Sequence, residues 1–103
     1  MKSTMDNKYI AQIKEIVFDQ LGTNEIEVIL YGSRARGDAH SRSDFDLAIK
    51  GKDRIPKKLL NSIKEKLEES HIPYKVDVVD FNTVSEVLKR EINKEGMTWE
   101  KLN

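Results

Sequence analysis

The sequence contains no cysteine, and this absence limits both its redox chemistry and its metal chemistry. Disulfides and thiolate catalysis are excluded, so a metal site has to be built from oxygen ligands or from the two histidines. Those histidines, His40 and His71, are single residues outside any metal-ligand spacing. The lack of cysteine also fits a reducing cytoplasm.

Long apolar runs and an excess of charge of one sign are missing as well. No run of about 18 apolar residues occurs, and the N-terminus lacks the apolar core of a signal peptide, so we expect a soluble, cytoplasmic protein without a membrane partner. Lys and Arg number 18 and balance 18 Asp and Glu, which argues against long nucleic acid as a partner. At 103 residues the chain predicts a single domain, residues 1–103, without a separate substrate-binding domain.

Apolar spacing predicts helices and strands that alternate along the chain. The expected helices are one capped by Asp6 or Asn7 that ends at Gly22, a short one after Gly32, one after Pro56 that closes near residues 70–71, and one that opens at the capping box 83–86 and stops at Gly96. The expected strands are residues 25–31, a second one around 44–49, and 74–79. This order predicts an α/β (α+β) fold with a small mixed sheet and flanking helices. The helix-sized crossover between the second and third strands favours their parallel or non-adjacent placement.

A Gly-Ser turn follows the first predicted strand directly. Gly32 and Ser33 stand where that strand ends and a short helix begins. Backbone N–H groups and a hydroxyl at such a point can hold phosphate oxygens. Because Gly and Ser are common turn residues, an ordinary strand-ending turn is the alternative reading.

Two carboxylates follow in the second apolar run. Asp44 and Asp46 are two residues apart, so a strand turns both side chains to the same face. Close carboxylates repel each other unless a cation joins them, and hard oxygen ligands suit Mg²⁺. The alternative is the polar face of a half-exposed edge strand, but Asp is disfavoured in strands.

Asp77 is the candidate for a third acid, since it lies between Val76 and Val78 in the third predicted strand. If that strand pairs beside the second, Asp77 joins Asp44 and Asp46. Three carboxylates can hold two metal ions roughly 3.5–4 Å apart, with Asp77 as ligand and proton acceptor. Simple alternation with a solvated side chain also explains Asp77, whereas Asp80 has the pattern of a turn residue.

Taken together, these motifs resemble a minimal nucleotidyltransferase of the DNA polymerase β superfamily, of the kind encoded beside HEPN-domain proteins in prokaryotic toxin–antitoxin pairs. The similarity covers nearly the whole chain. The family's Gly-Ser turn falls on Gly32 and Ser33. Its carboxylates fall on Asp44, Asp46 and Asp77. The resemblance implies a polymerase β-like fold and transfer of AMP from ATP to a hydroxyl, with a two-metal Mg²⁺ site and a tyrosine of the HEPN partner as acceptor.

Two alternatives exist for the arginines of the turn and for the apolar residues near the C-terminus. Arg36 matches the family's spacing from Ser33 better than Arg34 does, so we assign the nucleotide contact to Gly32, Ser33 and Arg36. Trp99 and Leu102 lie beyond the last predicted helix, where they either fold back on the core or dock on a partner.

Three functions compete on this reading. The leading hypothesis is a Mg²⁺-dependent adenylyltransferase that modifies a HEPN toxin and so acts as its antitoxin. The alternative is a non-catalytic antitoxin that neutralises a HEPN ribonuclease by binding alone. Transfer to a small-molecule hydroxyl ranks last, because the chain supplies no acidic pocket beyond the catalytic acids.

Overall fold

A computed structural model of the chain describes residues 4–39 and 43–100. The elements in chain order are α1 (Thr4–Leu21), β1 (Glu27–Tyr31), α2 (Ser33–Arg36), β2 (Phe45–Lys50), α3 (Lys57–Glu69), β3 (Val76–Asp80), the short 3-10 helix η1 (Phe81–Thr83), α4 (Glu86–Glu95) and β4 (Met97–Trp99). No helix in the described part of the chain is long and apolar enough to cross a membrane.

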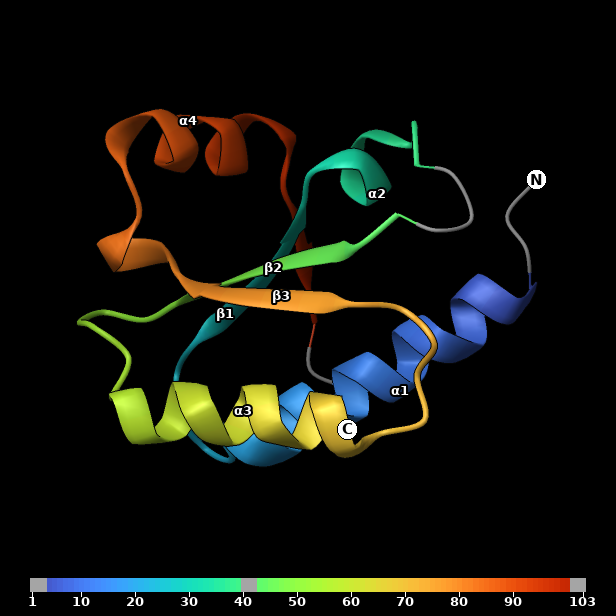
Figure 1. Ribbon diagram of the computed structural model, residues 1–103. Coiled ribbons are helices and arrows are strands. Elements are labelled where there is room, and N and C mark those ends of the chain that lie inside the picture. The colour runs from blue at the N-terminus through green and yellow to red at the C-terminus, as the bar shows by residue number, and fades with distance from the viewer. Residues whose placement is uncertain (1–3, 40–42, 101–103) are drawn as a thin grey trace.

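The four strands form one mixed sheet in the order β3-β2-β1-β4. Strand β1 is antiparallel to both β2 and β4, whereas β2 and β3 are parallel neighbours, which confirms the expected mixed sheet and parallel pair. Figure 1 shows α1 and α3 on one face of the sheet and α2 and α4 on the other. The sheet therefore has two different covered faces, and the candidate acids lie on the second.

Alternation along β2 decides which side chains face α1 and α3. Phe45, Leu47 and Ile49 are fully buried on that face, against Ile13 of α1 and Ile63 of α3. Burying a large apolar side chain stabilises a fold by about 1.5–3 kcal/mol, so this main core holds β2 in its orientation. The intervening residues of β2 consequently point to the face of α2 and α4.

A smaller core lies under α4, where Ile29, Ala48, Phe81 and Ile92 pack together. Gly96 joins α4 to β4 at this point, and a Cβ there would lie 2.4 Å from the carbonyl oxygen of Ile92 and 2.5 Å from Cγ2 of Ile29. The turn therefore needs glycine because of close packing.

The strand β4 was not predicted, and it settles the place of Trp99. Trp99 pairs with Val28 of β1, is buried in the main core, and has Nζ of Lys14 5.2 Å from its ring centroid. Of the two readings, folding back on the core is right for Trp99. Leu102 lies outside the described residues.

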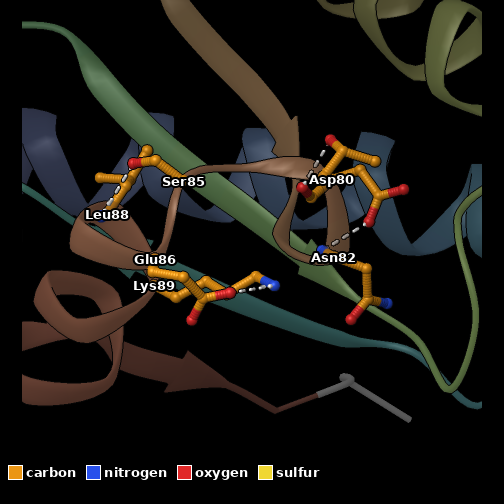
Figure 2. A network of polar contacts seen from close by, with 7 residues as sticks. Asp80, Asn82, Ser85, Glu86, Leu88 and Lys89 are labelled. Atoms are coloured by element: carbon orange, nitrogen blue, oxygen red, sulfur yellow. Dashed lines mark hydrogen bonds and ion pairs between the residues drawn. The ribbon is translucent and has the colours of Figure 1, made fainter.

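Two predicted helix starts were wrong. Helix α1 begins at Thr4, so Asp6 and Asn7 lie inside the helix and do not cap it. The cap of α4 is Ser85, whose Oγ accepts a hydrogen bond from the Leu88 N–H at 3.2 Å, as Figure 2 shows. The proposed cap Thr83 instead ends η1 and donates its hydroxyl to the carbonyl of Asp80 at 3.1 Å.

Asp80 has the turn role that its neighbours indicated, and it is also buried. One carboxylate oxygen accepts from the Ile55 N–H at 2.8 Å. The other accepts from the Asn82 N–H at 3.0 Å, as Figure 2 shows. The Asn82 amide in turn donates to the carbonyls of Gly51 and Asp53. The network ties the end of β3 to the loop between β2 and α3.

The buried contact makes Asp80→Ala a strongly destabilising substitution. We expect the free energy of unfolding to fall by about 1–3 kcal/mol, because the buried Ile55 N–H loses its acceptor. Urea denaturation followed by circular dichroism measures this change. Asp77→Ala is the matched control on the same strand, since the Asp77 side chain is 44% exposed. Equal stability of the two variants would contradict the structural role of Asp80.

Candidate active site

The register of the parallel strands brings two of the predicted acids together. Asp46 of β2 is the direct partner of Asp77 of β3, and Tyr31 of β1 is the partner of Asp46 on the other side. Directly paired residues share a face, so all three side chains lie on the face of α2 and α4. Asp80 stands opposite Ile49 and faces the main core instead. The structure therefore selects Asp77 over Asp80 as the neighbour of Asp46.

Asp44 lies one residue before β2, whereas it was predicted inside the strand. It is exposed, and its charge still reaches Asp46. The pKa of Asp46 is raised, first by burial and then by the charges of Asp77 and Asp44. Negative charge thus accumulates around Asp46, as expected for a site that receives a cation.

Tyr31 is a site residue that sequence reasoning missed. The pKa of its phenol is raised by burial and then by the charges of Asp46, Asp77 and Glu91, so it stays a neutral hydrogen-bonding group. Its position directly before Gly32 at the end of β1 was the available signal.

The carboxylates fit Mg²⁺ as a pair and not as a preformed cluster of three. The described residues contain no group of three His, Cys, Asp or Glu side chains gathered as metal ligands. Mg²⁺ usually needs only one or two carboxylates, with substrate phosphates and water completing its shell. Asp46 and Asp77 can supply these two. Nζ of Lys75 lies 3.7 Å from Asp77 Oδ1, and an exposed ion pair of this kind is weak enough to yield to a divalent cation.

Gly32 brings the Gly-Ser turn against the acid pair. Its backbone has φ 78° and ψ −157°, a conformation that favours glycine. A Cβ at this position would lie 2.6 Å from Asp46 Oδ2. The Gly32 carbonyl accepts from the N–H groups of Ala35 and Arg36 and so opens α2. The first N–H groups of such a turn have no partner within the helix and can meet phosphate oxygens.

The two arginines of α2 make different contacts. Arg36 donates to Asp38 Oδ2 at 3.0 Å and to Glu95 Oε2 at 2.9 Å, which joins α2 to α4 and raises its pKa further. Arg34 lies over the rings of Phe45 and Tyr74 and donates twice to the Ser43 carbonyl. Arg34 therefore positions the start of β2, whereas Arg36 is on the solvent side and stays the candidate for phosphate.

A pocket of about 580 Å³ opens beside the acid pair. Tyr31, Asp46 and Asp77 are part of its lining, and the other lining residues come from the C-terminal half of α3, from β3 and from the segment between them. The structure thus brings Gly32, Asp46 and Asp77 into one site with room for a ligand.

The model of the family described as "Polymerase beta, Nucleotidyltransferase" matches residues 11–98. The chain belongs to this nucleotidyltransferase family. The family resemblance inferred from the motifs is therefore confirmed, and so is the fold class.

Relatives of this nucleotidyltransferase share part of its sequence. "Probable protein adenylyltransferase MntA" of Haemophilus influenzae is 38% identical over 64 residues, which are 62% of this chain and 56% of the relative. The match thus spans little more than half of that relative's length.

Solved structures share its fold. A chain in the crystal structure of a toxin–antitoxin with AMP-PNP has a TM-score of 0.66 at 26% identity, covering 84% of this chain and 72% of that chain. A chain from the structure of tri-AMPylated Shewanella oneidensis HEPN toxin in complex with MNT antitoxin has a TM-score of 0.63 at 23% identity, covering 86% of this nucleotidyltransferase and 67% of that chain.

The close approach at Gly32 makes Gly32→Ala more damaging than an ordinary glycine substitution. We expect the free energy of unfolding to fall by about 1–3 kcal/mol because of backbone strain alone. The close contact between the new Cβ and Asp46 Oδ2 would lower it further. Gly37→Ala is the reference substitution, because Gly37 has φ 86° and ψ 10°, the ordinary left-handed conformation, and nothing lies within 4 Å of its Cβ position. Urea denaturation of both variants measures the difference, and equal losses would show that the contact is unimportant.

The raised pKa of Asp46 predicts a stability that depends on pH. The folded state holds this proton to a higher pH than the unfolded chain, so the stabilisation is present below the unfolded pKa of about 3.9 and is lost as pH rises through the folded pKa. Asp46→Asn removes the titrating carboxyl group, so the variant does not lose this stabilisation as pH rises. We expect the variant to be more stable than the wild type at pH 7, with the difference shrinking as pH falls towards about 4. The midpoints of urea denaturation of the wild type and the variant, measured across this pH range, test the prediction. A variant that is less stable than the wild type at pH 7 would contradict it.

Proposed function

We propose that this nucleotidyltransferase transfers AMP from ATP to a tyrosine hydroxyl of a partner HEPN toxin in a Mg²⁺-dependent reaction, and acts as its antitoxin. One observation carries the proposal: Asp46 is paired with Asp77 on the sheet face where Gly32 leaves no room for a Cβ beside Asp46. A turn suited to phosphate and a pair of acids suited to a cation are the two requirements of this chemistry.

Two relatives support the choice of reaction. The Haemophilus influenzae relative carries the name of a protein adenylyltransferase, and the neighbour at 26% identity was crystallised as a toxin–antitoxin with the ATP analogue AMP-PNP. These names support ATP as the donor and a protein of a toxin–antitoxin pair as the acceptor. The choice of a HEPN toxin rests on the family resemblance of the motifs.

Each site residue has a separate task in this reaction. Gly32 and Ser33 would hold the phosphates through the turn, and Asp46 and Asp77 would supply the carboxylate pair for Mg²⁺. The exposed Asp44 would add a third ligand from the residue before β2. When bound, Mg²⁺ offsets the negative charge of the triphosphate and of the attacking oxygen. The acceptor oxygen forms a bond to the α-phosphorus, its proton passes to Asp77, and the bond from the α-phosphorus to the bridging oxygen breaks, so that pyrophosphate leaves.

Arg36 has to exchange one partner for another during this cycle. Its guanidinium binds Asp38 and Glu95 at the surface, where ion pairs contribute little because water and salt screen them. The triphosphate carries more charge than either carboxylate, so Arg36 moves to it at small cost. Its charge then offsets the charge that develops on the leaving pyrophosphate.

Asp46→Asn should abolish the transfer while the fold remains. The product of the neighbouring reading frame, which the proposal expects to be a HEPN protein, is incubated with this protein, ATP and Mg²⁺, and its intact mass is measured. We expect an AMP-sized increase with the wild type that disappears with Asp46→Asn or with EDTA. Asp19→Asn on the exposed side of α1 is the control, because it makes the same chemical change outside the site. A tight complex without a mass change would favour the non-catalytic antitoxin.

A further inference from the structure

Strand β3 is the outer strand of the sheet on the side of the acid pair, as Figure 1 shows. The Phe45 N–H donates to the Lys75 carbonyl at 2.9 Å, which sets the hydrogen-bonding pattern of the parallel pair. Backbone groups alternate in direction along a strand, so those of Asp77 and Val79 point to β2. The N–H and carbonyl groups of Val76 and Val78 therefore point outward, away from the sheet.

The pocket of about 580 Å³ runs along this outer edge. Its lining includes the four consecutive residues Val76 to Val79. Successive side chains of a strand point to opposite faces, so a single cavity that meets four in a row lies beside the edge of the strand. Tyr31 and Asp46 line it on the acid face, and Leu67 and Glu68 line it on the side of α3. Among residues 4–39 and 43–100 no strand pairs with the outer edge of β3, and the pocket connects this edge to the candidate catalytic acids.

We propose that an extended segment of the acceptor protein binds along β3 as an additional strand of the sheet, and that this pairing delivers its tyrosine to the acid pair. The identity of the acceptor rests on the proposed function. The occupant is a polypeptide, because outward N–H and carbonyl groups recur at every second residue of β3. Another strand carries donors and acceptors with the same spacing.

The geometry of a sheet places the tyrosine. Neighbouring strands lie about 4.7–4.9 Å apart, and directly paired residues point to the same face. The residue paired with Asp77 therefore extends over the face that carries Asp46, and a tyrosine there brings its hydroxyl to Asp77, the proton acceptor. Its neighbours in the segment point to the other face, where Leu67 and Ile72 of the pocket lining lie. The acceptor segment accordingly has a tyrosine flanked by apolar residues.

Amide hydrogen exchange tests this pairing with residue resolution. The amides of this nucleotidyltransferase are followed by NMR, alone and in complex with the unmodified HEPN protein without ATP. The Val78 amide, which points outward, should exchange at least about tenfold more slowly in the complex. The Asp77 and Val79 amides are already bonded to β2 and serve as internal controls. Unchanged exchange at Val78 in a saturated complex would overturn the proposal.

Two substitutions at Val76 distinguish the contribution of its backbone N–H to binding from the contribution of its side chain. Val76 is the first residue of β3, where proline is tolerated, and its N–H points away from β2. Val76→Pro removes the outward donor, while Val76→Ala keeps the donor and shortens the side chain. We expect Val76→Pro to weaken binding of the HEPN protein about tenfold more than Val76→Ala does. Circular dichroism confirms that each variant is folded, and equal affinities of the folded variants would overturn the proposal.

The two proposals fail separately. Protection of Val78 without any AMP transfer would leave the strand pairing standing and remove the enzymatic function. AMP transfer that depends on Asp46 without protection of Val78 would leave the function standing and remove the strand pairing.

Discussion

The site depends on the parallel pairing of β2 with β3 in one particular register. This register places Asp46 beside Asp77 on one face, while Phe45, Leu47 and Val78 are buried on the other. A slip of one residue would move Asp77 into the main core and Val78 to the acid face. The cost of burying a carboxylate and exposing a valine opposes that slip, so the core that stabilises the fold also aligns the acids.

Asp80 is buried and Asp46 is partly buried, but the two side chains lie in opposite electrostatic surroundings. Asp80 is paired with two N–H groups and stabilises the end of β3. Asp46 lies in a partly buried position next to like charges, and this surrounding raises its pKa and disfavours its charged form. Proteins retain such unfavourable clusters mainly where function requires them. The contrast supports a role for Asp46 in chemistry and for Asp80 in architecture.

The helices and strands around the acid pair contribute different parts of the candidate site. Helix α2 brings Gly32 against Asp46, and the Arg36–Glu95 ion pair joins α2 to α4. Strands β3 and β4 are the two outer strands of the sheet, and the outer edge of β3 is the one that lies beside the acids. In the proposed reaction the nucleotide would approach from the turn at Gly32 and the acceptor would approach along the edge of β3.

Local patterns in the sequence were enough to identify the α/β class, the strand around Asp46, the Gly-Ser turn and the family. They did not reveal that Met97–Trp99 forms a strand, because three residues carry little periodicity and pair only when β1 is already in place. Spacing favoured Asp77 over Asp80 as the third acid but did not give the register that pairs Asp77 with Asp46, and it left Tyr31 unnoticed. Only the tertiary structure decided these points, since the partners of Asp46 come from separate strands and register depends on packing across the whole sheet.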